Sequence, residues 1–314
     1  MHQPIIRPMQ RADLAAAEKV QRIAFGTRFG LPDPSTFRGD AQLVPTRWTT
    51  DASTAFIAEV DGTIAGGALG MDWGSVFIVG PVFVHPDHAG RGIARLLMQK
   101  LVELADARPL TFAGLFTFPE SAVHVRLYES VGFAAQMLTP IMTKAPVASG
   151  AGTNVGFLRF SELSAAQRDD TRRACARLTD AIFPGLDLGR EIDAVAQQKL
   201  GETVLLADKD GIHGFAVCHF GAGSEGGSGN LFIKFAAVRP GAERDFGDLL
   251  DACERMAGAI GATRIAAGTN MARREAYRVM RERGFRAGLV GVAMLRPDSA
   301  GYNRPDAFVI DDWR

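Results

Sequence analysis

The sequence predicts an α/β protein made of two domains that share one plan. The chain has 314 residues, which is long for one ordinary domain and sufficient for two. Helical and strand patterns alternate along it. One order of elements occurs in each half: helix, strand hairpin, long strand, V-x-P turn, helix, strand, helix and Gly-Phe. A repeat of this length indicates duplication of a whole domain.

In the first half, amphipathic periodicity predicts helices, and apolar or alternating runs predict strands. Asp61-Gly62 has the composition of a two-residue hairpin turn. Gly132 is expected to end the last helix, because glycine readily adopts the left-handed conformation found there. The predicted elements are a helix at 11–25, a strand pair within 54–71, a strand at 75–84, a helix at 96–107, a strand at 110–118 and a helix at 123–133.

The second half repeats this order after a stretch of small residues that predicts a linker. The domain boundaries are therefore placed at 1–145 and 155–314, with the linker at 146–154. Ser161 is expected to cap the first helix, and Asp210-Gly211 to turn the strand pair. The predicted elements are a helix at 161–182, a strand pair within 203–220, a strand at 231–238, a helix at 248–262, a strand at 263–270 and a helix at 274–285.

Composition argues against several classes of protein. Lys plus Arg equals Asp plus Glu at 35 each, which argues against a nucleic-acid partner. No apolar run reaches the roughly 20 residues that span a membrane, so we expect no membrane association. The 3 cysteines form no C-x-x-C motif and are expected to be free thiols. The N-terminus lacks a secretory signal pattern, so we expect a cytoplasmic protein.

The stretch GRGIARLL predicts a ligand-binding loop. Gly90 and Gly92 allow a sharp turn and close approach of a ligand, and amide N–H groups at the start of the following helix favour an anion such as a pyrophosphate. The alternative is a tight turn without a ligand. Neither a Gly-Lys-Ser/Thr sequence nor a third glycine is present, so the loop fits neither a P-loop nor a dinucleotide-binding fingerprint.

Three neighbouring motifs give this loop a family resemblance. Val84-x-Pro86 precedes it, and Leu127-Tyr128-Glu129 and Gly132-Phe133 follow. Together they resemble the GNAT superfamily of acyl-CoA-dependent N-acyltransferases, over residues 5 to 143. The resemblance implies a mixed, strongly twisted sheet flanked by helices, in which strands 76–84 and 110–118 splay apart. It also implies acetyl-CoA as cosubstrate.

The resemblance also assigns cofactor-binding positions. The pantetheine arm is expected along Val82, Phe83 and Val84, where a backbone N–H would also polarise the thioester carbonyl. Ala89 departs from the family's phosphate motif, which has Arg or Gln at this position; we expect the change to tune affinity. The motif falls on Ala89, Gly90, Arg91, Gly92, Ile93 and Ala94.

Tyr128 stands where many family members carry the tyrosine that protonates the departing thiolate, so it is the predicted general acid. Its alternative role is to cover the helix core. The base is open among Asp72, Glu59 and Glu120; a water chain, or an amine that arrives already neutral, would need no dedicated base. His124 is a candidate substrate contact or a partly exposed, solvated histidine. The two histidines in HPDH lack a further ligand cluster, so no metal site is predicted.

The second half lacks the corresponding parts. Glu243, Asp245 and Asp248 crowd the start of its helix with negative charge, which would repel a pyrophosphate. Met280 stands in the place of Tyr128. We therefore expect one coenzyme A site per chain and a second domain that shapes the acceptor pocket or forms a homodimer. The last residues, Asp311 to Trp313, are either an ordinary last strand with a polar end or a segment whose acids, or the terminal carboxylate, reach the active cleft from the second domain.

The acceptor is expected near residues 24–40. Phe25, Phe29 and Phe37 either line an apolar acceptor pocket or pack in the core. The predicted function is transfer of acetyl from acetyl-CoA to a primary amine of a small molecule. The alternatives are an acyl-CoA sensor without turnover and acetylation of a peptide or protein N-terminus.

Overall fold

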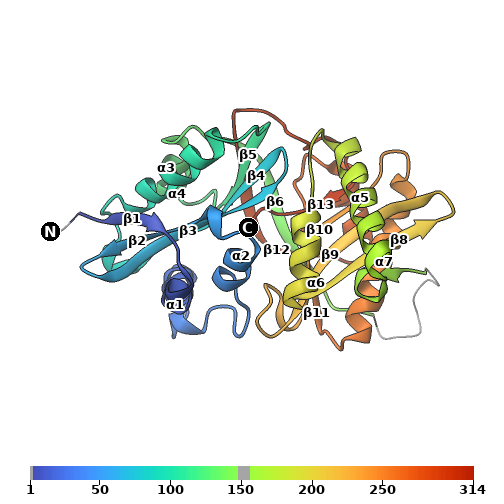
Figure 1. Cartoon of the computed structure of the whole chain (residues 1–314), viewed down its shortest axis with the longest axis horizontal. Helices are drawn as coiled ribbons and strands as arrows, with labels where there is room; N and C mark the ends of the chain where they lie inside the picture. The colour runs from blue at the N-terminus through green and yellow to red at the C-terminus, as the bar shows by residue number, and fades with distance from the viewer. Residues whose placement is uncertain (1–2, 148–155) are drawn as a thin grey trace.

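The computed structural model describes residues 3–147 and 156–314 (Figure 1). Most of the predicted linker, residues 148–154, lies outside this range. Within the described residues the strands form one mixed sheet of 13 strands, flanked by helices. The expected α/β class with a mixed sheet is confirmed.

The first half begins with β1 and ends with β6. In Figure 1, α3 and α4 lie over one face of its strands, and α1 and α2 lie over the other. The elements are β1 (Ile5–Pro8), α1 (Leu14–Arg28), α2 (Val44–Thr50), β2 (Ala55–Val60), β3 (Thr63–Trp73), β4 (Val76–Val84), α3 (Ile93–Asp106), β5 (Phe112–Thr117), α4 (Ala122–Glu129) and β6 (Ala134–Lys144).

The second half follows the same plan and adds a short final strand. The elements are β7 (Leu158–Arg159), α5 (Ala165–Ile182), α6 (Gly189–Gln198), β8 (Gly201–Asp208), β9 (Gly211–Gly221), β10 (Gly227–Val238), α7 (Phe246–Ala259), β11 (Arg264–Gly268), α8 (Arg274–Glu282), β12 (Arg286–Arg296) and β13 (Val309–Ile310).

Local signals predicted most turns, with two corrections. Asp61 and Gly62 form the expected hairpin turn, with φ of 51° and 75°. In the second half Asp208 pairs with Gly211, so the turn lies at 209–210 and not at 210–211. Ser161 does not cap α5. Ser164 does, through a reciprocal capping box with Gln167, because the helix begins at residue 165.

The two halves exchange their last strands. The sheet order runs β4-β5-β12-β6-β11-β10, so β12 lies beside β5 of the first half and β6 lies beside β11 of the second. β6 and β12 also pair with each other at the centre of the sheet (Figure 1). Backbone hydrogen bonds therefore join the halves, and separating them would break the ladders on both sides of these strands.

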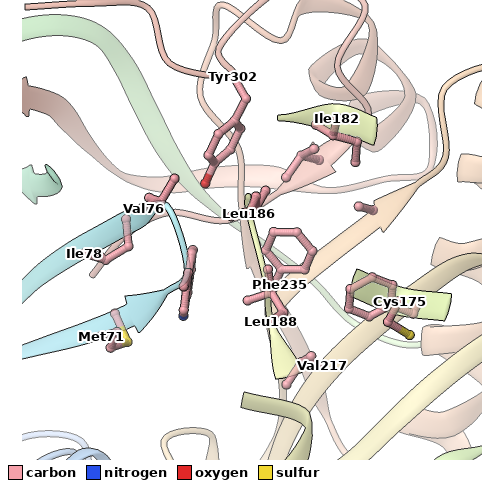
Figure 2. Close-up of a cluster of buried hydrophobic side chains, with 14 of the residues drawn as sticks. Met71, Val76, Ile78, Cys175, Ile182, Leu186, Leu188, Val217, Phe235 and Tyr302 are labelled. Carbon is pink, nitrogen blue, oxygen red and sulfur yellow. The ribbon is translucent and has the colours of Figure 1, made fainter. Parts of the chain in front are cut away.

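A hydrophobic core crosses the boundary between the halves. Met71, Val76 and Ile78 of the first half face Leu186 and Phe235 of the second (Figure 2). The strands predicted at 75–84 and 231–238 from their apolar runs thus each bury one face against the opposite half. This packing holds β4 in a fixed position relative to the second half.

Candidate active site

One segment of β4 has a strand neighbour on one side. β4 pairs with β3 as far as Val84, but its parallel pairing with β5 ends where Val79 meets Leu115. Beyond that point β5 continues beside β12, with Thr117 opposite Val292. Residues 80–84 therefore form an edge with no partner strand on the β5 side among the described strands. We call this segment the open edge.

Alternation along the strand decides which backbone groups face the opening. His85 N–H donates to the carbonyl of Ala65 on β3 at 2.8 Å. Successive residues of a strand point their N–H and C=O groups to opposite sides, so those of Val82 and Val84 face away from β3. Phe83, which was also predicted to contact the cofactor, turns its backbone towards β3 and its side chain into the core under α1. Val82 N–H is the first available donor, because Pro81 has none.

The predicted phosphate loop lies at the end of the same strand. Gly90 and Gly92 adopt φ of 74° and 76°, a backbone conformation that residues other than glycine rarely adopt. Gly92 is the N-cap of α3, and it leaves the first N–H groups of this 14-residue helix without a side-chain cap. A Cβ on either glycine would meet nothing within 4 Å among the described residues. Ala89 is exposed, so the loop has space for a ligand of some size.

Tyr128 lies on α4 with its side chain turned inward. It is 9% exposed and packs in the core between the sheet and α3 with Val79 and Leu97. Burial raises the pKa of Tyr128 to about 12, and a hydrogen bond with Thr117 opposes this effect. Thr117 is the last residue of β5, beyond the point where β5 leaves β4. The hydroxyl therefore stays protonated near the opening at neutral pH.

Comparison with known proteins identifies a family for the first half. Residues 21–133 match the acetyltransferase (GNAT) family. The chain belongs to the GNAT superfamily. The matched residues lie in the first half, which carries the open edge, the loop and Tyr128. It is thus a member of a family of acyltransferases that generally use acyl-CoA.

Individual relatives differ in how much of the chain they cover. The L-amino acid N-acyltransferase MnaT of Escherichia coli is 27% identical over 143 residues, covering 43% of this chain and 82% of the relative. A putative acetyltransferase from Pyrococcus horikoshii superposes with a TM-score of 0.72 at 13% identity, covering 99% and 95% of the two chains. A tandem GNAT protein from the clavulanic acid pathway gives 0.56 at 12% identity, covering 93% and 98%. The structural likeness shows that the tandem GNAT fold includes both halves.

The structure removes two of the three candidate bases in this GNAT chain. Glu59 lies on β2 and forms an ion pair with Arg7 of β1, two strands away from β4. Asp72 pairs with Phe77, four positions along β3 from the partner of Val82, which corresponds to about 13 Å. Its carboxylate contacts Arg108 at 3.3 Å. Glu120 alone lies between β5 and α4, with its carboxylate 2.7 Å from Arg28.

The three predicted acceptor-pocket residues lie together. Phe37 stacks on Phe25 at 5.7 Å and on Phe29 at 5.5 Å between ring centroids. Phe29, which is 41% exposed, meets the edge of Phe118 at 5.7 Å. These rings form an aromatic row from α1 to the end of β5. Phe118, the last residue of the predicted strand 110–118, was not predicted as a pocket residue; the observed strand ends one residue before it.

His124 lies one helical turn before Tyr128 on α4. Its Nδ1 is buried and has no hydrogen-bond partner in the described part of the chain. Burial, together with the nearby Arg28 guanidinium, lowers the pKa of His124. Its ring centroid lies 6.2 Å from that of Phe118, at the end of the aromatic row. The side chain is partly exposed, as the second expectation for His124 had it, but its Nδ1 is shielded from solvent.

The second half fills the position that corresponds to the open edge. Aligning the two V-x-P turns places Ala236 and Ala237 opposite Val82 and Phe83. Both alanines pair with β13, which thus occupies the side of β10 that faces β11. Asp245 is the N-cap of α7, and Met280 is fully buried. These features support the expectation that the second half binds no coenzyme A.

The C-terminal residues extend from β13 to the first half. Asp311 does not reach the open edge, because it accepts hydrogen bonds from Arg273 at 2.9 Å and from Tyr302 at 2.7 Å. Trp313 makes the contact instead. A Cβ on Gly114 of β5 would lie 2.9 Å from its indole, and one on Gly80 would lie 3.9 Å from its carbonyl oxygen.

Arg47 is the residue near the site that the sequence did not reveal. Its Nη1 donates to the carbonyl of Gly80 at 2.7 Å, and its Nη2 to the main-chain oxygen of Arg314 at 2.6 Å. An isolated arginine in a polar helix gives no pattern that would have singled it out. The described residues contain no cluster of metal-ligating side chains and no helix long and apolar enough to cross a membrane.

Proposed function

We propose that the protein transfers an acetyl group from acetyl-CoA to a primary amine of a small molecule. The observation that carries the proposal is the open edge of β4. At Val82 and Val84 backbone groups face away from β3, where no described strand pairs with them. The start of α3, which has no side-chain cap, lies at one end of the edge, and Tyr128 lies on its β5 side. One extended ligand with an anionic end and a thioester end matches these features in order.

In the proposed reaction the neutral amine forms a C–N bond with the thioester carbonyl. Negative charge develops on the carbonyl oxygen, where Val82 N–H is the candidate donor. The C–S bond then breaks, and the thiolate takes the proton of Tyr128. The ammonium proton returns to the tyrosinate through water or through a base such as Glu120 or His124, which restores the starting state.

Two features support a small amine with an apolar part. The aromatic row of Phe25, Phe37, Phe29 and Phe118 lies on the α1 side of the sheet and leaves Phe29 accessible. MnaT of Escherichia coli, which acts on L-amino acids by its name, matches 43% of the chain. The alternative is an acyl-CoA sensor without turnover. It is favoured by one observation: each of the three candidate bases forms an ion pair with an arginine.

The test measures thiol release from acetyl-CoA with a broad panel of amines. We expect Tyr128→Phe to lower kcat about a hundredfold while coenzyme A binding is kept. The matched control is Tyr277→Phe, which removes a hydroxyl from α8 of the second half. Gly92→Glu should abolish binding through strain and charge. Gly241→Glu is its control, because Gly241 also has positive φ and open space, in the turn before α7.

Each outcome decides between the proposals. Turnover with at least one amine that is lost in Tyr128→Phe but kept in Tyr277→Phe supports the enzyme. Binding of acetyl-CoA without turnover of any amine supports the sensor. Equal loss of binding in Gly92→Glu and Gly241→Glu would contradict the assignment of the phosphate loop to the first half.

A further inference from the structure

Four charged side chains form a buried row between the two halves. Arg47 comes from α2, Glu225 from the loop between β9 and β10, Lys234 from β10 and Glu191 from α6. Their exposed fractions are 3%, 1%, 7% and 2%. Positive and negative groups alternate along it, so the row carries no net charge. We call these four residues the charge row.

The contacts of the charge row are short and directional. Glu225 accepts from Arg47 Nε at 3.1 Å and from Nη2 at 2.7 Å. Lys234 Nζ lies 2.8 Å from Glu225 and 2.9 Å from Glu191. Trp73 Nε1 donates to Glu191 at 3.0 Å, which anchors the far end on β3. Despite burial, the pKa of Glu225 lies well below its usual value, because Arg47 and Lys234 stabilise the carboxylate.

The Arg47 end of the charge row contacts the open edge. With two donors engaged by Glu225, the planar guanidinium of Arg47 directs Nη1 to the carbonyl of Gly80. Gly80 directly follows the last β4 residue that pairs with β5. The bond therefore holds the backbone at the point where it loses one strand neighbour, two residues before Val82.

The second half brings Glu225 to this point by a docked loop. Ser228 N–H donates to Asp40 at 2.8 Å, Gln42 N–H donates to the carbonyl of Ser224 at 3.0 Å, and Arg38 donates to the carbonyl of Glu225 at 2.6 Å. The loop and the start of β10 thus contact residues 38–42, which lead into α2. Because α2 carries Arg47, this docking brings Arg47 and Glu225 together.

Stability alone is a poor reason for such a row. Buried ion pairs repay little more than their desolvation cost, and apolar residues of similar size often replace them without loss. We propose that Glu225 is a positioning residue for the open edge: through Arg47 and Gly80 it fixes the β4 backbone that receives acyl-CoA. This rests on the proposed function, and it gives the second half a role in a reaction whose groups lie in the first.

The test replaces the ion pair by an apolar pair. The double variant Arg47→Met, Glu225→Met leaves Lys234 with Glu191, so the core stays neutral and we expect it to fold. A second variant, Arg47→Lys, keeps the charge, but an ammonium cannot bind Glu225 twice and also reach Gly80. The control double variant Lys144→Met, Glu254→Met removes the 2.7 Å ion pair between β6 and α7, away from Gly80.

Two measurements are made on the full chain. The first is hydrogen exchange of peptides covering residues 79–85 without ligand. The second is the affinity for coenzyme A. We expect both test variants, but not the control, to exchange faster in this peptide and to bind about tenfold more weakly, as for loss of a hydrogen bond to a charged group.

Unchanged exchange in the test variants would overturn the positioning role. Faster exchange with wild-type affinity for coenzyme A would overturn its link to the cofactor. A wild-type protein that binds no coenzyme A contradicts the proposed function instead, and exchange alone then decides whether the charge row positions the edge.

Discussion

His219 is expected to make the stability of the protein depend on pH. It lies on β9, is 1% exposed and has no hydrogen-bond partner in the described chain for either ring nitrogen. Burial, with the nearby Lys234 ammonium, lowers the pKa of His219 from 6.5 to about 4. The native protein thus holds the imidazole neutral in a pH range where the unfolded chain binds a proton.

The sign and the size follow from this difference. The stability contributed by neutral His219 is fully present above about pH 6.5 and is lost as the pH falls towards 4. At 1.36 kcal/mol per pKa unit, the free energy of unfolding should fall by about 3 kcal/mol over this range through His219 alone. Replacement by leucine, which has similar volume and no ring nitrogens, removes this contribution.

The assay is urea unfolding of wild type and His219→Leu at several pH values between 7 and 4. Carboxylates also titrate in this range, so the difference between the two proteins is the informative quantity. We expect wild type to lose about 3 kcal/mol more than the variant. Parallel curves with the same loss in both proteins would refute the reasoning.

Three further predictions use other parts of the molecule. Calorimetric titration should give one coenzyme A site per chain, because β13 covers the corresponding edge of β10; two sites would contradict this. Ser164→Ala should lower the free energy of unfolding in urea by about 1 kcal/mol through loss of the capping box, whereas no change would argue against that cap. Cys175, Cys218 and Cys253 are buried and should react with a disulfide reagent only after denaturation; rapid reaction of the native protein would show that a thiol is accessible.

Local sequence signals predicted the elements that carry the candidate chemistry. Gly90 and Gly92 adopt the conformation that only glycine takes easily, and Asp61-Gly62 turns its hairpin as expected. These features depend on a few consecutive residues, so their physical cause is visible in the sequence. Tyr128 was found by resemblance, and its burial beside β5 came from the structure.

The sequence by itself determined the two-fold repeat and the mixed α/β class. It also showed that the Gly-x-Gly loop of the first half has no counterpart in the second. The tertiary structure decided which strands became neighbours. β6 and β12 exchange places, and β13 covers an edge that a local pattern would leave free. It also joined Arg47 to Glu225, which are 178 residues apart. Periodicity reports which face of an element is buried, but strand order and buried charge pairing depend on long-range geometry that no local pattern contains.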